Sequence, residues 1–383
     1  MAIHSIDDQI ERTRGRPAGF DYLRIGLAVA IIAWHTVITC YGPDAQTAFR
    51  VGPFRPLIAV IVPSFFALSG FLVAGSLLRN DIFEFLTLRV MRIMPALFCE
   101  VVISALLIGP AVTSLPLAEY FSAPEFRSYF WNILGHIHYE LPGVFQTVPA
   151  GSYVNLQLWT VPFELKCYLV ITALAIGGMI ARPRWLMGFA VFLTVALTAY
   201  TAFRHEFPPM DYPPSGTLCV LSFLFGVALY GLRAQIPLRG DLFALSAAAG
   251  WVLLLYPQTS LFAALPVAYL TVWLGLQNPR KFFVVNGADY SYGLYLYGFP
   301  VQQMIAYALP DYRIWYVNLA LALLFAGVCA LLSWHMVERP VQRARPQILG
   351  FVRNLVRRFM PPDIASPSQD PRRRAATRPV RPS

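Results

Sequence analysis

The stretch FDYLRIGLAVAIIAWHTVITCYG, residues Phe20 to Gly42, is long and apolar enough to cross a lipid bilayer. A membrane-spanning helix needs about 20 such residues. The stretch nevertheless contains three ionisable side chains, Asp21, Arg24 and His35. Because a charged group at the bilayer centre costs about 3 kcal/mol or more on insertion scales, each of them is a candidate functional residue.

The composition of the whole chain indicates an integral membrane protein. Of its 383 residues, 57% are apolar and only 13% are charged, whereas soluble domains carry about 25% charged residues. The net charge of +10 is better explained by membrane topology than by nucleic-acid binding, because Lys and Arg are retained on the cytoplasmic side. We therefore expect membrane lipids as partners and no nucleic acid.

Ten apolar segments predict an all-α, polytopic transmembrane helix bundle of about ten helices. The segments are 20–41, 56–78, 90–114, 155–180, 185–203, 215–234, 241–256, 260–277, 289–309 and 313–336. Little more than YPQTS separates the seventh from the eighth, so a nine-helix alternative, in which these two merge or one is lost, stays open.

The basic residues predict that both termini are cytoplasmic. With the N-terminus inside, the cytoplasmic loops and the N-terminal segment hold twelve Lys and Arg residues and the outer loops hold five, as the positive-inside rule expects. This arrangement divides the chain into a cytoplasmic segment (1–18), a membrane domain (19–341) and a basic Pro/Arg-rich cytoplasmic tail (342–383). We expect the tail to be largely disordered after about residue 360 and to lie on anionic lipid.

Two further features bear on processing and on metals. Asp21 and Arg24 interrupt the first apolar run, and no small-residue cleavage site follows, so we expect no cleavable signal peptide. The cysteines are scattered, without metal-ligand spacing, so we expect neither a disulfide nor a metal site; they are Cys40, Cys99, Cys167, Cys219 and Cys329.

The connection of residues 115–154 is the longest outer loop and is rich in aromatic residues. Loops of this length are usually functional or disordered, and this one is too aromatic to be disordered. It is therefore interpreted as a folded or re-entrant cap over the outer face. The alternative is a structural belt of aromatic residues at the membrane interface.

Helical geometry places the three ionisable residues of the first segment on one stripe. Arg24 and His35 are eleven residues apart, which is about 20° beyond whole turns and roughly 16.5 Å along the axis. Asp21 precedes Arg24 by three residues and so can pair with it. The first helix is thus predicted to carry an ion pair at its cytoplasmic end and a histidine much deeper on the same face.

Glu164, in the fourth segment, is predicted to lie at about the same depth as His35. A histidine and a glutamate at one depth can serve as a general base and its orienting or proton-accepting partner. We therefore predict His35 and Glu164 as catalytic residues. The alternative, a histidine used only in helix packing, is common in membrane proteins. Lys166 faces elsewhere, where it can extend toward the interface or pair locally.

Arg89 and Arg92 are three residues apart at the cytoplasmic end of the third segment. Two guanidinium groups on one face suit a phosphate or pyrophosphate; the alternative is contact with lipid headgroups. The small residues of the second segment, Ser69, Gly70, Ala74 and Gly75, allow close approach of another helix or of a thin ligand. Together these features fit an acyl-CoA, with its phosphates at the arginines and its thioester reaching inward.

Six motifs, in order along residues 18–341, resemble those of the acyltransferase 3 family of membrane O-acyltransferases. They are FDYLRIGLAVAIIAWH with Arg24 and His35, FFALSGFLV with Ser69, RVMRIMP with Arg89 and Arg92, LWTVPFELKCYL with Glu164, DYSYGLYLYGFPVQ, and VERP. The resemblance differs at Gly298, where many members carry a histidine.

The resemblance implies a multi-pass enzyme of the inner (plasma) membrane that takes acetyl-CoA or another acyl-CoA as cytoplasmic donor. It implies a glycan or lipid-linked saccharide as acceptor, and polysaccharide biosynthesis or export machinery as a possible partner. His35 is then the catalytic base or a transient acyl carrier. Glu164 orients it or relays its proton. Arg24, Arg89 and Arg92 hold the donor phosphates, Asp21 positions Arg24, and Ser69 contacts the donor.

Two alternatives remain open. The same buried charges could form a proton or substrate path in a transporter or flippase, although no internal repeat is evident. The chain could also be a binding or assembly subunit of a polysaccharide exporter, with a structural His35.

Overall fold

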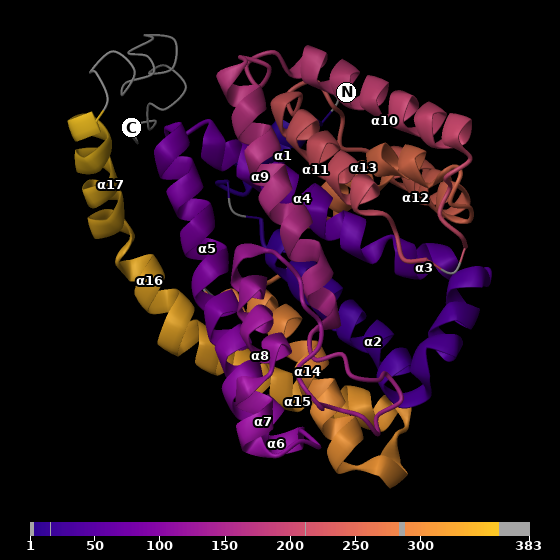
Figure 1. Ribbon diagram of the computed structural model, residues 1–383. Helices are drawn as coiled ribbons and strands as arrows, with labels where there is room; N and C mark the ends of the chain where they lie inside the picture. The colour runs from indigo at the N-terminus through magenta and orange to yellow at the C-terminus, as the bar shows by residue number, and fades with distance from the viewer. Residues whose placement is uncertain (1–3, 16, 211, 283–287, 360–383) are drawn as a thin grey trace.

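The computed structural model describes residues 4–15, 17–210, 212–282 and 288–359. Within these ranges the regular structure is helical and no β-strand forms; the only extended pairings are isolated bridges. Figure 1 shows the helices packed side by side as a bundle. The predicted all-α class is therefore confirmed, whereas the tail beyond residue 360 lies outside the described residues.

Six helical stretches of the described chain are long and apolar enough to cross a membrane. They are α2 (Gly19–Val51), α3–α4 (Arg55–Leu77), α5–α6 (Ile82–Val112), η3–α9 (Leu156–Ile176), α10 (Pro183–Arg204) and α15–α16 (Trp315–Arg343). Three shorter apolar stretches join them: α11 (Gly216–Gly231), α12 (Gly240–Leu254) and η4–α13 (Ser260–Gly275). These lengths are those of a membrane helical bundle, and the protein is a membrane protein.

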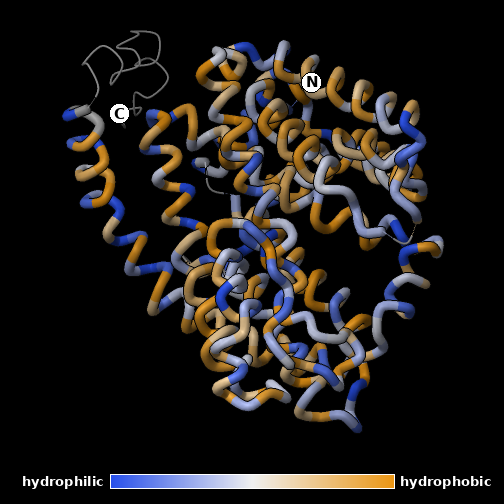
Figure 2. The backbone as a smooth tube through the Cα atoms, viewed as in Figure 1, coloured by the Kyte–Doolittle hydropathy of each residue, from blue (hydrophilic) through white to orange (hydrophobic). Residues whose placement is uncertain are grey.

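Every predicted segment contains a helix, including α14 (Ser291–Ala308) in the ninth. The seventh and eighth segments form separate helices, α12 and α13 (Ala264–Gly275), with the η4 turn (Ser260–Ala263) before α13. The number of bilayer crossings stays a prediction. Hydrophobic residues predominate along α10 to α13, and exposed apolar side chains such as Phe203 suit contact with lipid (Figure 2).

The first helix continues beyond its predicted end. α2 runs to Val51, but Gly42 adopts φ 85°, outside helical values, and Pro43 follows it. The left-handed backbone requires a residue without a side chain, and proline cannot continue the helical hydrogen bonds. The predicted boundary at residue 41 therefore falls at a kink, after which the second arm of α2 turns to a new direction (Figure 1).

Helices α4 (Ile61–Leu77) and α11 meet through their backbones. A Cβ atom at Gly70 would lie 2.1 Å from the carbonyl oxygen of Phe223, and one at Gly226 would lie 2.2 Å from that of Ala67. A Cβ at Gly75 would lie 2.9 Å from the hydroxyl of Tyr230. The glycines of the second segment thus serve helix–helix contact, while Ser69 is left to face the interior.

The long outer connection is folded. It contains α7 (Leu117–Ser122), α8 (Pro124–Tyr129) and η2 (Phe130–Leu134), which lie at the bottom of Figure 1. Its side chains Tyr120, Tyr129, Val144 and Phe145 are buried. The segment is therefore ordered, as predicted. Its role as a cap over the outer face, or as an aromatic belt at the membrane interface, stays a prediction.

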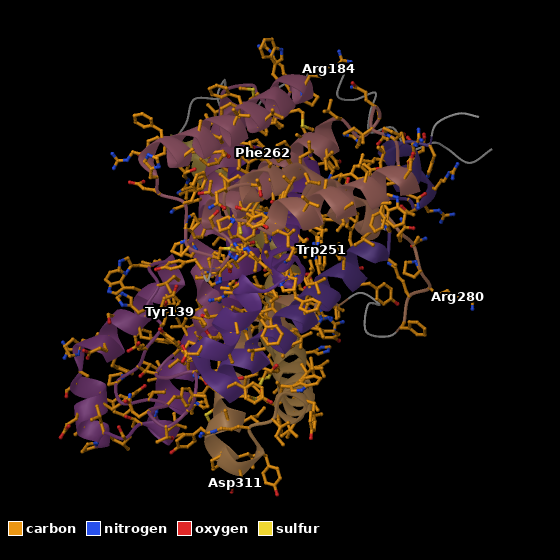
Figure 3. All side chains as sticks on the ribbon, turned by 90° about the vertical axis from the view of Figure 1, so that its right-hand side faces the viewer. Tyr139, Arg184, Trp251, Phe262, Arg280 and Asp311 are labelled. Carbon is orange, nitrogen blue, oxygen red and sulfur yellow. The ribbon has the colours of Figure 1, made fainter. Side chains whose placement is uncertain are left out.

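Two loops predicted for opposite membrane sides lie far apart in Figure 3, whereas Arg280 and Tyr139, also predicted for opposite sides, lie at a similar height in that view. Figure 3 places Arg184, from a predicted cytoplasmic loop, at one end and Asp311, from a predicted outer loop, at the other. Helices α1 (Ile6–Arg12) and α17 (Arg345–Phe359) both lie in the upper part of Figure 1, away from α7 and α8. The cytoplasmic location of both termini stays a prediction.

Candidate active site

One cavity brings most of the predicted donor residues together. Its walls come from α2, α4, α5 (Ile82–Ile103), α9 (Val161–Ile176), α11 and α14. The lining includes five predicted site residues, namely Arg24, Ser69, Arg89, Arg92 and Glu164. Aromatic and hydroxyl side chains complete it, among them Thr160, Tyr168, Ser291, Tyr292 and Tyr295. A mostly apolar cavity with a few convergent polar groups is typical of a ligand site.

An ionic cluster fixes two of the arginines. Asp289 accepts a hydrogen bond from Arg24 at 3.1 Å and one from Arg92 at 2.6 Å. Arg92 also donates to Glu338 at 2.9 Å, and Asp21 lies 3.9 Å from Arg24. Arg92 is therefore held between two carboxylates, and its orientation is set before any ligand arrives. The predicted pairing of Asp21 with Arg24 is present, but Asp289 is the closer partner.

Arg89 has a different environment from Arg92. Among the described residues, no carboxylate lies within ion-pair distance of Arg89, and its buried Nε atom has no hydrogen-bond partner. Its guanidinium lies 5.7 Å from the ring centre of Phe85 and 6.0 Å from that of Tyr168. Stacking on aromatic rings stabilises the cation without using its hydrogen-bond donors. These donors are thus available to an anion in the cavity.

Glu164 lies in the same cavity, in the first turn of α9. Its Oε1 atom accepts a hydrogen bond from the hydroxyl of Tyr168 at 2.6 Å. The positive charges of Arg92 and Arg89 attract the carboxyl group of Glu164. Lys166 lies outside this group, with its Nζ atom 4.9 Å from the ring centre of Phe163. Glu164 is therefore placed beside the arginines and can polarise or orient a donor group.

His35 is buried but does not line the cavity. Its side chain is 7% exposed and meets the ring of Phe299 edge-on, with the ring centres 5.1 Å apart. Ile38, one turn further along α2, packs with Phe299 and with Ala150 of the outer connection. The structure thus groups Glu164 with the arginines and places His35 against α14 near the outer connection. The joint action of His35 and Glu164 stays a prediction.

The departure from the family pattern at Gly298 has a steric basis. A Cβ atom at this position would lie 2.8 Å from Cγ1 of Ile32 on α2. A side chain at residue 298 would therefore require the Ile32 side chain or the two helices to shift. In this chain Gly298 allows the close contact of α2 with α14.

Sequence reasoning assigned no role to Asp289 or Glu338, although both lie in quoted motifs. Asp289 is 265 residues from Arg24, and Glu338 is 246 residues from Arg92. No helical periodicity reports contacts at such separations. The sequence did show that each of these carboxylates lies next to an apolar segment, and a carboxylate in such a place is expected to have a partner.

The comparisons with known proteins agree with this geometry. A family model described as an acyltransferase domain matches residues 18–337. An O-acetyl transferase of Shigella phage Sf6 is 26% identical over 341 residues, covering 86% of this chain and 97% of the relative. Nodulation protein 10 of Rhizobium leguminosarum bv. viciae is 24% identical over 376 residues, covering 89% and 97%.

No solved structure matches the chain significantly. The family match, in contrast, spans both membrane-helix motifs that supply the arginines and the later motifs that supply Glu164 and Asp289. The chain therefore belongs to the acyltransferase 3 family and is an acyltransferase.

Proposed function

We propose that the protein is an O-acyltransferase of the inner (plasma) membrane, specifically an O-acetyltransferase. It moves the acyl group of cytoplasmic acetyl-CoA to a hydroxyl of a glycan or lipid-linked saccharide. The observation that carries the proposal is the guanidinium of Arg89, which has no carboxylate within ion-pair distance in the described part of the chain and lines a cavity with Glu164. The name of the phage relative, an O-acetyl transferase, supports the choice of reaction. Family membership favours an enzyme over a transporter.

Donor binding is assigned to the arginine side of the cavity. Arg89 donates to the CoA phosphates, since charge-assisted bonds from a guanidinium to phosphate are strong and geometrically specific. Arg24 and Arg92 add positive charge in orientations fixed by Asp289. Ser69 lines the same space and contacts the narrow part of the donor.

The acyl transfer is assigned to His35. The acceptor hydroxyl attacks the thioester carbonyl, and the imidazole of His35 takes the hydroxyl proton. The C–S bond then breaks, the thiolate of CoA leaves and takes up that proton, and the ester remains on the acceptor. The donor extends from the cavity to His35, and the acceptor enters from the outer side. Glu164 orients the donor or relays the proton. The water-excluded interior strengthens each of these polar contacts.

The proposal is tested with proteoliposomes that contain the purified protein, labelled acetyl-CoA and lipid-linked saccharides extracted from host membranes. A positioned base typically contributes 10²- to 10⁴-fold, so His35→Ala is expected to lower label transfer by about that factor. The matched control is His205→Asn, at the exposed end of α10, which should keep wild-type transfer. Full transfer by His35→Ala would refute the catalytic assignment.

A further inference from the structure

A second group of buried polar side chains lies beside the cavity and has no part in the proposed chemistry. Glu100 of α5, Ser104 at the start of the π-helical turn η1 (Ser104–Ile108), and Asn155 are completely buried, and Gln157 is 1% exposed. Their burial amid apolar helices makes each unmade hydrogen bond costly. A single acidic residue in such a place needs an explanation.

These side chains form one connected network. The hydroxyl of Ser104 donates to Oε1 of Glu100 at 2.6 Å, and the amide of Asn155 donates to the same oxygen. The Asn155 amide also contacts the hydroxyl of Tyr129 at 2.7 Å. Gln157 donates to the side-chain oxygen of Asn155 at 3.1 Å. Glu100 thus links α5 to the outer connection and to η3 (Leu156–Thr160).

The network continues to the cavity wall. The amide of Gln157 donates to the carbonyl oxygen of Leu296 on α14 at 2.6 Å. The backbone carbonyl of Gln157 accepts from Thr160 at 3.2 Å and from Tyr295 at 2.9 Å, and the hydroxyls of these two residues are 2.6 Å apart. Thr160 and Tyr295 line the cavity. The start of α9, which carries Glu164, therefore takes its position from Glu100 through two amides.

Glu100 is suited to this task as a neutral acid. Within the described part of the chain, no Lys, Arg or His lies within ion-pair distance of its carboxyl group, and its Oε2 atom has no partner. An unpaired carboxylate at such a depth would be strongly unfavourable, so the group keeps its proton. A neutral carboxyl group and a carboxamide have nearly the same shape and both offer an acceptor oxygen.

We propose that Glu100 is a positioning residue that acts in its protonated form. Through Asn155 and Gln157 it fixes the wall that carries Thr160 and Glu164, and it thereby aligns the bound donor for transfer. The proposal rests on the proposed function, because it assigns a catalytic consequence to the placement of Glu164.

The test compares Glu100→Gln, Glu100→Leu and Gln157→Leu in the proteoliposome assay described above. Glu100→Gln should keep at least about half of the wild-type kcat, because the carboxamide reproduces the acceptor oxygen. Glu100→Leu should lower kcat by about 10- to 100-fold, because misplaced reacting groups cost rates of this order. The KM for acetyl-CoA should stay within about twofold, since Arg89 and Arg92 are untouched.

A double-mutant cycle and a control complete the experiment. Glu100→Leu combined with Gln157→Leu should be no worse than either single variant, because both break the same network. The control Thr194→Val removes a buried hydroxyl that bonds only within α10 and should behave as wild type. If Glu100→Leu does not fold, Gln157→Leu carries the same prediction.

Three outcomes would overturn the proposal. An inactive Glu100→Gln would mean that an ionised carboxylate is required. Unchanged kcat in both Leu variants would mean that the network has no part in catalysis. A lower melting temperature of these variants with normal kcat would mean that the network only supports the fold. His35→Ala is measured in parallel: if it is fully active, the proposed function fails, whereas an inactive His35→Ala with a normal Glu100→Leu removes only the positioning role.

Discussion

Arg92 and Glu338 are 246 residues apart in the sequence, and their side chains form an ion pair at 2.9 Å. Glu338 is delivered by the π-helical turn η7 (Trp334–Glu338), which follows α15 (Trp315–Ser333). The pair therefore ties the last long helix of the bundle to α5, one turn from Arg89. The RVMRIMP motif and the closing VERP motif therefore meet in one cluster.

Removing the negative charge at this cluster should destabilise the protein. Glu338 is 4% exposed, and in Glu338→Gln the charge-assisted bond to Arg92 becomes a neutral one, although Asp289 remains. The expected loss in unfolding free energy is about 1–3 kcal/mol, measured by thermal unfolding in detergent. The exposed Glu119→Gln serves as control. An unchanged melting temperature for Glu338→Gln would show that the pair contributes nothing.

Arg89 should dominate donor affinity. A hydrogen bond to a charged group contributes about 1.5–3 kcal/mol, so Arg89→Ala should raise the KM for acetyl-CoA by roughly 10- to 100-fold. Arg89→Lys should restore part of the affinity, because it keeps the charge and loses the planar donor fork. The exposed Arg239→Ala, whose partner is Asp241, should have no effect. A normal KM in Arg89→Ala would exclude phosphate binding by this residue.

The contact between α4 and α11 predicts a strong glycine effect. Gly70→Ala would force a methyl group against the Phe223 carbonyl, and overpacking of this kind costs about 1–3 kcal/mol or more. Gly327→Ala, on α15, has open space around its Cβ position and should be neutral or stabilising by up to about 1 kcal/mol. Comparison of the two melting temperatures checks this prediction, and equal values would contradict it.

The predicted topology can be checked by cysteine labelling. Glu125 in α8 and Gln347 in α17 are both exposed. In intact cells with a permeabilised outer barrier, a membrane-impermeant maleimide should label Glu125→Cys directly and Gln347→Cys only after the membrane is disrupted. The unsubstituted protein, whose five cysteines are free, gives the background. Direct labelling at both positions would place the loop and the C-terminal helix on the same side.

The outer connection should respond to pH through a histidine pair. Nδ1 of His136 lies 2.9 Å from Nε2 of His138, and burial together with the charge of His136 lowers the pKa of His138 below its usual 6.5. The native loop thus favours neutral His138. Its contribution to stability is complete above pH 6.5 and decreases as the pH falls below that value.

Limited proteolysis of residues 113–155 at pH 5.5 and pH 7.5 measures this effect. Cleavage should be faster at the lower pH in the wild type, and His138→Asn should reduce the difference. A pH difference of the same size in that variant would assign the effect to another group.

The positions of the helices could be predicted from the sequence, because each apolar segment listed above contains a helix in the structure. Periodicity also brought Arg24 and Asp21 together. Periodicity could not predict that Arg89 and Arg92 have different environments, because residues at i,i+3 spacing share one face of a helix. Their difference depends on two carboxylates, one from η7 and one from the residue pair before α14, which reach Arg92 through contacts across most of the chain.

The depth argument for His35 and Glu164 used helix ends near residues 41 and 155, where the structure has a kink and a 3-10 turn, and the common depth of the two side chains stays a prediction. α2 continues through the kink at Gly42 to Val51, and α9 follows a 3-10 turn rather than beginning at residue 155. Depth along a helix also says nothing about which cavity a side chain lines. Glu100 was missed because a lone acid in an apolar run has no recognisable spacing, and its partners Asn155 and Gln157 lie in another segment.

The backbone contact of α4 with α11 has a consequence for the shape of the cavity. Side chains that pack between helices can change rotamer and absorb a shift, but two backbones in contact through Gly70 and Gly226 have no such compliant layer. The wall of the cavity that α4 forms therefore has a fixed backbone position relative to α11. Tyr292 and Tyr295 of α14 also line the cavity, and their hydroxyl groups donate to the backbone carbonyls of Ile93 and Gln157. On the α4 side, a bound molecule must therefore fit the helix as it stands, because no layer of side chains at Gly70 and Gly226 can take up a shift.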